Sequence, residues 1–194
     1  AVNGRHWVQQ DRAYFNNGLG LFRTAAPVGA REGTGYVATL ADFDGDGDLD
    51  AVIARDLLPA LMVRNDGHGN FDAGEEFGPM LQARSALAGD LDSDGDTDLV
   101  VSLRGEVNIL FLNDGTGQLS ASASIGGEYQ TIGGAMADLD NDGDLDLIFS
   151  NQGGEGVLVH LNDGEAGFDE GRFIGAELDL ETRAIAMGDM NDDG

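Results

Sequence analysis

The sequence predicts an all-β fold assembled from one repeated unit. Two markers recur along the 194 residues with the same period, an Asp-rich stretch and an Asn-Asp-Gly turn. Between the markers the segments are short, rich in aliphatic and β-branched residues, and bounded by Gly or by the turn, which favours strands over helices. No gap between markers holds an amphipathic helix of about ten or more residues, so a parallel α/β arrangement is excluded.

The Asp-rich stretch occurs three times in full and once in part. The three full copies read DFDGDGDLD, DLDSDGDTD and DLDNDGDLD, the partial copy reads DMNDDG, and they begin at Asp42, Asp90, Asp138 and Asp189. Successive starts are therefore 48, 48 and 51 residues apart. The turn marker keeps the same period in segments that begin at Phe15, Arg64, Leu112 and Leu161. Two independent markers in one period indicate a true internal repeat.

Each repeat is expected to hold four strands. One apolar segment precedes the Asp-rich stretch, a second follows it, a third runs into the Asn-Asp-Gly turn and a short fourth leaves it. In the repeat around Asp138 the first three segments are 132–137, 147–150 and 157–161. Four antiparallel strands per repeat is the composition of a propeller blade. The sequence therefore predicts a β-propeller of four-stranded antiparallel blades with Asp-rich calcium loops, here a partial propeller of about four blades.

The repeat boundaries divide a single propeller region, residues 1–194. The divisions are a partial blade at 1–32, blades at 33–80, 81–128 and 129–180, and the start of a further blade at 181–194. The two ends of the chain align with homologous positions near an Asp-rich loop, so each lies inside a repeat. We expect additional polypeptide or a second copy of the chain to complete the ring, because an open stack of blades leaves apolar faces and a strand edge uncovered.

The Asp-rich stretch has the ligand pattern of a calcium loop. Calcium takes six to eight oxygen ligands, and alternate residues of a tightly coiled loop can point inward together. We expect side-chain oxygens from loop positions one, three, five and nine and a main-chain carbonyl from position seven. The residues are Asp42, Asp44, Asp46, Asp48 and Asp50; Asp90, Asp92, Asp94, Asp96 and Asp98; Asp138, Asp140, Asp142, Asp144 and Asp146; and Asp189, Asn191 and Asp193 of the partial copy. Position seven, which contributes only its main chain, is Asp48, Asp96 or Asp144.

Other interpretations of the loops fit less well. An EF-hand loop needs a bidentate Glu at position twelve, where this chain has Ile53, Val101 and Phe149. Merely solvated acidic loops are disfavoured because converging carboxylates without a cation repel one another. Magnesium prefers a smaller, largely hydrated octahedral site. Zinc is disfavoured because the chain has no Cys and only three His, all outside the loops.

The repeat resembles the FG-GAP and VCBS repeats of integrin α-subunit propellers and of many secreted bacterial proteins. The resemblance rests on an apolar strand, Asp-x-Asp-x-Asp-Gly-x-x-Asp, and a second short strand. The Phe-Gly and Gly-Ala-Pro signatures of the integrin version are absent, and the trailing Asn-Asp-Gly-x-Gly-x-Phe is similar to the bacterial VCBS form. The family implies a propeller, usually seven-bladed, with calcium between the first two strands of a blade, away from the usual ligand-binding face.

Composition limits the partners. With 36 acidic against 10 basic residues the net charge is −26, which disfavours nucleic acid and anionic membrane surfaces. No apolar run approaches the roughly 20 residues of a membrane span. The resemblance implies a secreted or cell-surface location. We expect a calcium-binding extracellular module for adhesion or recognition, non-catalytic, with a glycan or protein ligand on the face opposite the calcium loops.

The alternative is the propeller domain of a secreted polysaccharide-active enzyme, a lyase or a hydrolase. No catalytic residue is assigned, because neither a Cys nucleophile nor a Ser-centred elbow motif accompanies the three His residues. Either function would use loops on the ligand-binding face. The candidates there are Arg5, His6, Trp7, Arg55, Asp56, Arg84, Arg104, Glu106, Tyr129, Asn151, Gln152 and Arg183.

Overall fold

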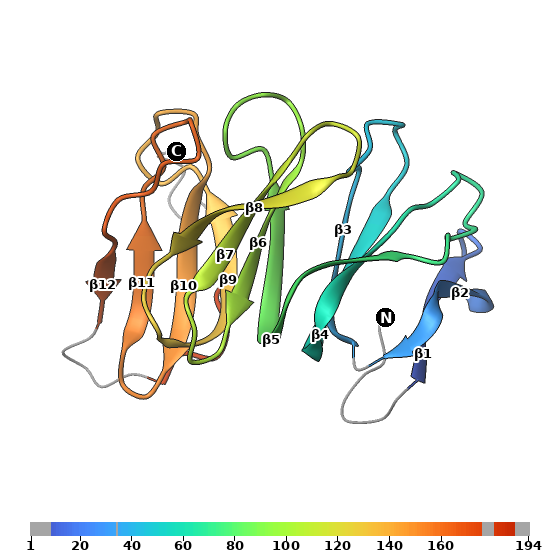
Figure 1. Ribbon diagram of the computed structural model, residues 1–194, viewed down its shortest axis with the longest axis horizontal. Helices are drawn as coiled ribbons and strands as arrows, with labels where there is room; N and C mark the ends of the chain where they lie inside the picture. The colour runs from blue at the N-terminus through green and yellow to red at the C-terminus, as the bar shows by residue number, and fades with distance from the viewer. Residues whose placement is uncertain (1–8, 34, 176–180, 189–194) are drawn as a thin grey trace.

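The fold is built from antiparallel strands. The computed structural model describes residues 9–33, 35–175 and 181–188, and within these ranges it contains no helix (Figure 1). None of the described residues therefore belongs to a helix able to cross a membrane. The strands are β1 Gln9–Asn16, β2 Phe22–Gly33, β3 Gly35–Ala41, β4 Asp50–Val63, β5 Glu75–Gly89, β6 Asp98–Leu103, β7 Asn108–Asn113, β8 Leu119–Ile125, β9 Gln130–Ala137, β10 Asp146–Gln152, β11 Gly156–His160 and β12 Arg172–Ile174. The all-β prediction is confirmed.

The strands form three sheets in which each strand pairs with its neighbours along the chain. The sheets are β1-β2, β3-β4-β5-β6-β7-β8 and β12-β11-β10-β9, and every pairing is antiparallel. The last sheet is a four-stranded meander that runs from Gln130 to Ile174. It has the strand number expected of one blade.

The six-stranded sheet departs from the expected pattern of separate strands. The first part of β4 pairs with β3 and its second part, which begins at Asp56, pairs with β5; Leu57 has a φ of 59° near the start of this second part. In the same way β5 pairs first with β4 and then with β6, and Gly78 has a φ of 69°. Strands that were expected to be separate therefore run on as single bent strands.

The hydrophobic core is divided into three clusters, each between two successive repeats. In β4, Ala51 and Ile53 join the cluster shared with Val28 of the first repeat, whereas Val52 and Ala54 join the cluster shared with the third repeat. Successive side chains of a strand point to opposite faces, so both faces of this strand are buried. A third cluster joins β6 and β7 to β10 and β11. The repeats are thus stacked face to face, as layers.

The layers follow one another in chain order along the longest axis (Figure 1). Strands β1 and β2 lie at one end of the molecule and β12 lies at the other. The described strands do not close into a ring, since no strand of the β1-β2 sheet pairs with the β9–β12 sheet. A closed propeller and its number of blades therefore remain predictions.

Candidate metal centre

The three complete Asp-rich loops lie at the same end of the strands. They connect β3 to β4, β5 to β6 and β9 to β10, along the upper edge of the view in Figure 1. Because the strands alternate in direction, the Asn-Asp-Gly turns return to this same end. Every metal loop therefore has the turn of its own repeat beside it.

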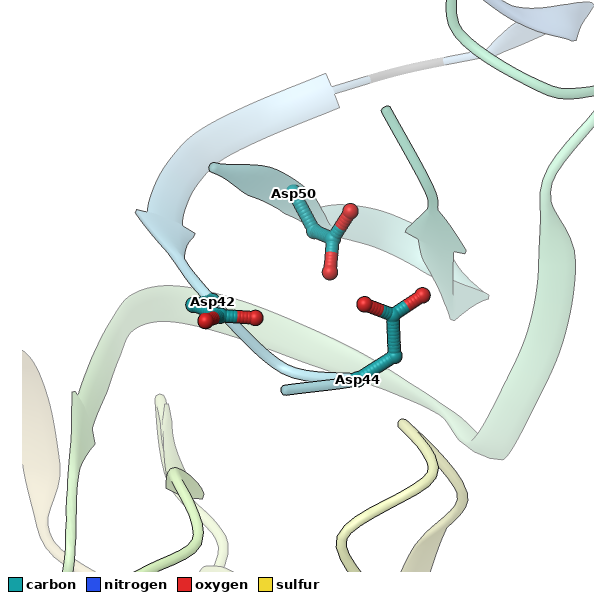
Figure 2. A group of neighbouring side chains, drawn as sticks. All are labelled: Asp42, Asp44 and Asp50. Atoms are coloured by element: carbon teal, nitrogen blue, oxygen red, sulfur yellow. The ribbon is translucent and has the colours of Figure 1, made fainter. Parts of the chain in front are cut away.

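The first loop brings three of its carboxylates together. One oxygen each from Asp42, Asp44 and Asp50 lies within 4.8 Å of the other two, and Figure 2 shows these groups turned toward one another. The loop backbone fixes the first ligand, because the N–H groups of Gly45 and Gly47 both donate to the Asp42 carboxylate at 2.9 Å. Gly47 has a φ of 90°, a conformation that favours glycine.

The aspartate at position nine is the most firmly held of the set. Asp50 is fully buried at the start of β4, where it accepts N–H bonds from Phe43 at 3.2 Å and from Asn65 at 2.8 Å. The same pair of bonds recurs at Asp98 and Asp146 with distances of 2.7–2.9 Å. One donor always comes from loop position two, and the other always comes from the Asn of the Asn-Asp-Gly turn.

The other two loops form similar clusters with one difference. In the third loop positions one, three and nine converge again, as Asp138, Asp140 and Asp146. In the second loop the converging residues are positions one, three and five, Asp90, Asp92 and Asp94, so that Asp98 lies outside the cluster.

Some predicted ligands lie outside the clusters. The position-five residues Asp46 and Asp142 each accept an N–H bond from position seven, at 2.9 and 3.0 Å. The position-seven side chains lie against the neighbouring turns, where a Cβ added to Gly67, Gly115 or Gly164 would collide with their carboxylates. Asp189, Asn191 and Asp193 fall outside the described residues.

Four of the loop carboxylates have a raised pKa in the metal-free chain. Burial raises the pKa of Asp50 and of Asp98, and the nearby loop carboxylates raise both further, while backbone N–H bonds oppose this in part. The pKa of Asp92 is raised by desolvation and then by the charge of Asp94. The pKa of Asp140 is raised by desolvation and by its acidic neighbours. A bound cation would remove this penalty.

Two carboxylate oxygens in the clusters are buried without a hydrogen-bond partner. They are Asp44 Oδ1 in the first loop and Asp90 Oδ1 in the second. Leaving a buried acceptor unsatisfied costs roughly 1–3 kcal/mol, and more for a charged group. A cation between the carboxylates would satisfy both oxygens, so the residues fit a hard, oxygen-loving metal ion.

A comparison with protein families points to the same loops. Residues 90–149 match the model of a family described as FG-GAP-like repeat. This segment is similar to FG-GAP-like repeats. It contains the second and third Asp-rich loops together with β6 to β9. Repeats of the FG-GAP family often bind calcium and are typically extracellular.

The family match identifies the type of repeat but not its subfamily. It does not distinguish the VCBS form from other FG-GAP-like repeats, so that assignment stays a prediction. No curated protein matches the chain by sequence.

The expected ligand-face residues are largely engaged in internal contacts. Arg55 is buried and forms an ion pair with Glu76 at 2.8 Å. Arg84 stacks over the Tyr36 ring at 4.5 Å. Asn151 is buried and accepts a hydrogen bond from the Thr131 hydroxyl at 2.8 Å. Arg5, His6 and Trp7 lie outside the described residues. The geometry gives the three engaged residues structural roles.

Two features of the metal loops escaped the sequence analysis. The Asn of the Asn-Asp-Gly turn, used above only as a marker of the repeat, holds the position-nine carboxylate of the loop. Arg64 places its Nε 3.8 Å from Asp44 Oδ2, beside the first cluster. A signal for each was present, since the turn shares the period of the loops and Arg64 aligns with Leu112 and Leu161.

Proposed function

We propose that this chain is a calcium-binding part of an extracellular β-propeller that serves adhesion or recognition without catalysis. The observation that carries the proposal is the repeated carboxylate cluster, in which buried oxygens of Asp44 and Asp90 lack any other partner. Calcium is the best candidate among common cations because the donors are all hard oxygens. The similarity of residues 90–149 to FG-GAP-like repeats supports the same ion.

Calcium has a structural role in this proposal. The ion would be held by Asp42, Asp44 and Asp50 in the first loop, with the remaining oxygens supplied by the rest of the loop or by water. Position nine belongs to the second strand of its repeat, whereas positions one and three belong to the connection. An ion between them would tie the connection to the sheet and stiffen that end of the molecule.

Face-to-face stacking supports the propeller. Each described interface between repeats buries aliphatic side chains from both partners, as propeller blades do. In two of these interfaces the apolar residue at loop position two, Phe43 or Leu91, is part of the core.

The interface between the first two repeats is less completely filled. A cavity of about 410 Å³ lies there, lined by side chains that include Tyr14, Phe15, Ala51 and Asn65. In the later interfaces the Asn equivalent to Asn65 contacts the position-two residue of the preceding repeat. The cavity therefore suits the strand and loop of a further repeat, supplied by additional polypeptide or by a second copy of the chain.

A glycan or protein ligand is proposed for the end of the strands opposite the metal loops. The connections β6–β7 and β10–β11 lie at that end and are free of Asp-rich sequence. Their separation from the loops would let calcium stiffen the scaffold without occupying the ligand surface. A glycan array and a protein array, probed in calcium and again in chelator, test this part of the proposal.

The metal-binding part is tested by calorimetric titration of the metal-free chain with calcium. Asp90→Asn should remove or strongly weaken one of the bound ions, because it neutralises a carboxylate whose Oδ1 is buried in the cluster. Glu106→Gln, which changes an exposed acid at the opposite end, is the matched control and should leave the titration unchanged. Equal loss in both variants, or no heat of binding at millimolar calcium, would reject the assignment.

A further inference from the structure

In the third and fourth repeats, a single Asn side chain joins two metal loops. The Asn113 amide donates to Thr97 O of its own loop at 2.9 Å and to Phe43 O of the preceding loop at 2.7 Å. Asn162 repeats the arrangement with Leu145 O at 3.2 Å and Leu91 O at 2.9 Å. Both Asn residues are buried. The contacts span about 70 residues of sequence and recur in two interfaces.

The same residues also hold the position-nine carboxylates. Phe43 N–H donates to Asp50 while its carbonyl accepts from Asn113, whose own N–H donates to Asp98 at 2.9 Å. Leu91 continues the pattern, with its N–H on Asp98 and its carbonyl on the Asn162 amide. Asn162 N–H then donates to Asp146 at 2.9 Å. An unbroken path of hydrogen bonds thus runs through all three loops.

The links in this path are stiff. Phe43 and Leu91 have fully buried side chains in the clusters between repeats, so the two peptide groups that flank each Cα move together. Fixing Asp50 around an ion therefore orients the Phe43 carbonyl, which orients Asn113. The N–H of Asn113 then holds Asp98 in place beside the second cluster.

We propose that the loops bind calcium cooperatively, with Asn113 and Asn162 transmitting the effect between neighbouring repeats. This inference rests on calcium being the ion of the loops. Binding of the first ion orders the residues that the two loops share, and the entropy cost of this ordering reduces the affinity for that ion. The next ion binds to a loop that is already ordered, so its binding does not include this cost. By linkage the coupling is equal in both directions. A coupling of the usual size raises the affinity of the second ion by about fivefold or more.

Repulsion between bound cations acts in the opposite direction. This repulsion lowers the affinity for each later ion, and added salt screens the repulsion where the sites are exposed to solvent. Cooperativity carried by hydrogen bonds should persist at high salt, so titrations at two salt concentrations separate the two effects.

The test compares two Asn variants of the full chain. Asn113→Ala removes the side chain that joins the first loop to the second. Asn65→Ala is the matched control, because the described contacts of the Asn65 amide donor group reach only Leu49 O of its own loop, at 3.2 Å. The Hill coefficient for calcium should exceed 1 in the unmodified chain and in Asn65→Ala, and should fall in Asn113→Ala.

A second comparison isolates the coupling between two loops. Asp44→Asn disables the first loop. In the otherwise unmodified chain it should lower the calcium affinity of the second loop about fivefold or more. In a chain that already carries Asn113→Ala it should leave the affinity of the second loop unchanged. If Asn113→Ala does not fold, Asn162→Ala tests the link between the second and third loops in the same way.

The outcomes separate this inference from the calcium assignment. Three ions bound without cooperativity, or equal Hill coefficients with and without the Asn113 amide, would overturn the coupling alone. Failure of the chain to bind any calcium would overturn both proposals.

Discussion

At the residue scale, Arg64 makes the first metal loop unlike the others. Its guanidinium lies 3.8 Å from Asp44, a candidate ligand, and it is partly exposed. A positive charge at this position competes with a cation for the carboxylate. Because such pairs near the surface contribute only about 0.2–1 kcal/mol, we expect the first loop to bind calcium a few-fold more weakly on this account.

Arg64→Leu should therefore raise the calcium affinity of the first loop, by about 1.5- to 5-fold for an ion pair of that strength. Leu is the natural choice because it occupies the equivalent positions 112 and 161. The measurement is a calcium titration in a background where Asp92→Asn and Asp140→Asn disable the other loops. Arg104→Leu, a change at the opposite end of the strands, is the control; a weaker first loop in Arg64→Leu contradicts the prediction.

Two features favour glycine at position 115 in the Asn-Asp-Gly turn, the backbone conformation and the lack of space for a Cβ. Its φ is 77°, and an added Cβ would collide with the Asp96 carboxylate. Gly95 has a φ of 94° but open space around its Cβ position. Gly115→Ala should lower the free energy of unfolding by about 1–3 kcal/mol, and by more than Gly95→Ala does. Denaturant unfolding in chelator measures both; an equal loss would show that the collision is absent.

The buried acids give the metal-free chain an unusual pH dependence. The pKa values of Asp50 and Asp98 are raised above the ordinary value of 3.8 by burial, so the folded state takes up protons more readily than the unfolded state. Their contribution to stability is therefore most favourable below that value and is lost as pH rises through their folded pKa values. The lowered pKa values of Asp66 and Asp114 act with the opposite sign, but only below about 3.9.

Because the raised pKa values of Asp50 and Asp98 favour the folded state at lower pH, acidification from neutral pH toward about 4 should raise the melting temperature in chelator. In calcium the same acidification should lower the melting temperature, because protons compete with the ion for the carboxylates. Thermal melts at matched pH values with and without calcium give the two slopes. Slopes of the same sign in both buffers would contradict the account.

At the element scale, loop position two anchors the first two metal loops to the core, through Phe43 and Leu91. Leu91 is 1% exposed between the third and fourth repeats, whereas Leu49 in the first loop is 56% exposed. Leu91→Ala should cost about 2–5 kcal/mol of unfolding free energy through lost burial and the cavity left behind. Leu49→Ala should change it by no more than about 0.5 kcal/mol. Denaturant unfolding checks the pair; similar losses would mean that Leu91 does not anchor its loop.

The metal loops could be predicted from sequence because their chemistry is local. Ligands recur at every second residue within nine, and the requirement for oxygen donors is visible without a fold. The strands beside the loops could also be predicted, since apolar segments and turn residues alternate there. Long-range contacts were not, because the bonds from Asn113 to Phe43 and from Asn162 to Leu91 join residues about 70 apart.

The bent strands β4 and β5 also escaped prediction, for a local reason. The turn at Leu57 uses a residue that rarely adopts a positive φ, here 59°, so no turn signal marks it. Gly78 supplies the other positive φ, but a single Gly inside an apolar segment indicates a bulge as readily as a strand end. Pairing with neighbours, rather than sequence, sets these boundaries.

At the scale of the whole molecule, the cavity between the first two layers should influence association. It exposes apolar side chains such as Leu40 and Tyr14, which a further repeat would cover. The purified 194-residue chain should therefore form dimers or larger assemblies. Light scattering measures the mass, and a monodisperse monomer of 20.3 kDa would contradict the proposal that a second copy completes the stack.

The net charge of −26 makes metal binding a property of the whole fold as well as of its loops. Three calcium ions would cancel six of these charges where they are most concentrated, and an ion that binds only the folded state stabilises it. The most direct test is equilibrium dialysis of the metal-free chain against millimolar calcium, with the bound metal counted by elemental analysis. The account predicts about three ions per chain, and a fourth if Asp189, Asn191 and Asp193 are completed into a loop; a chain that retains no calcium would contradict it.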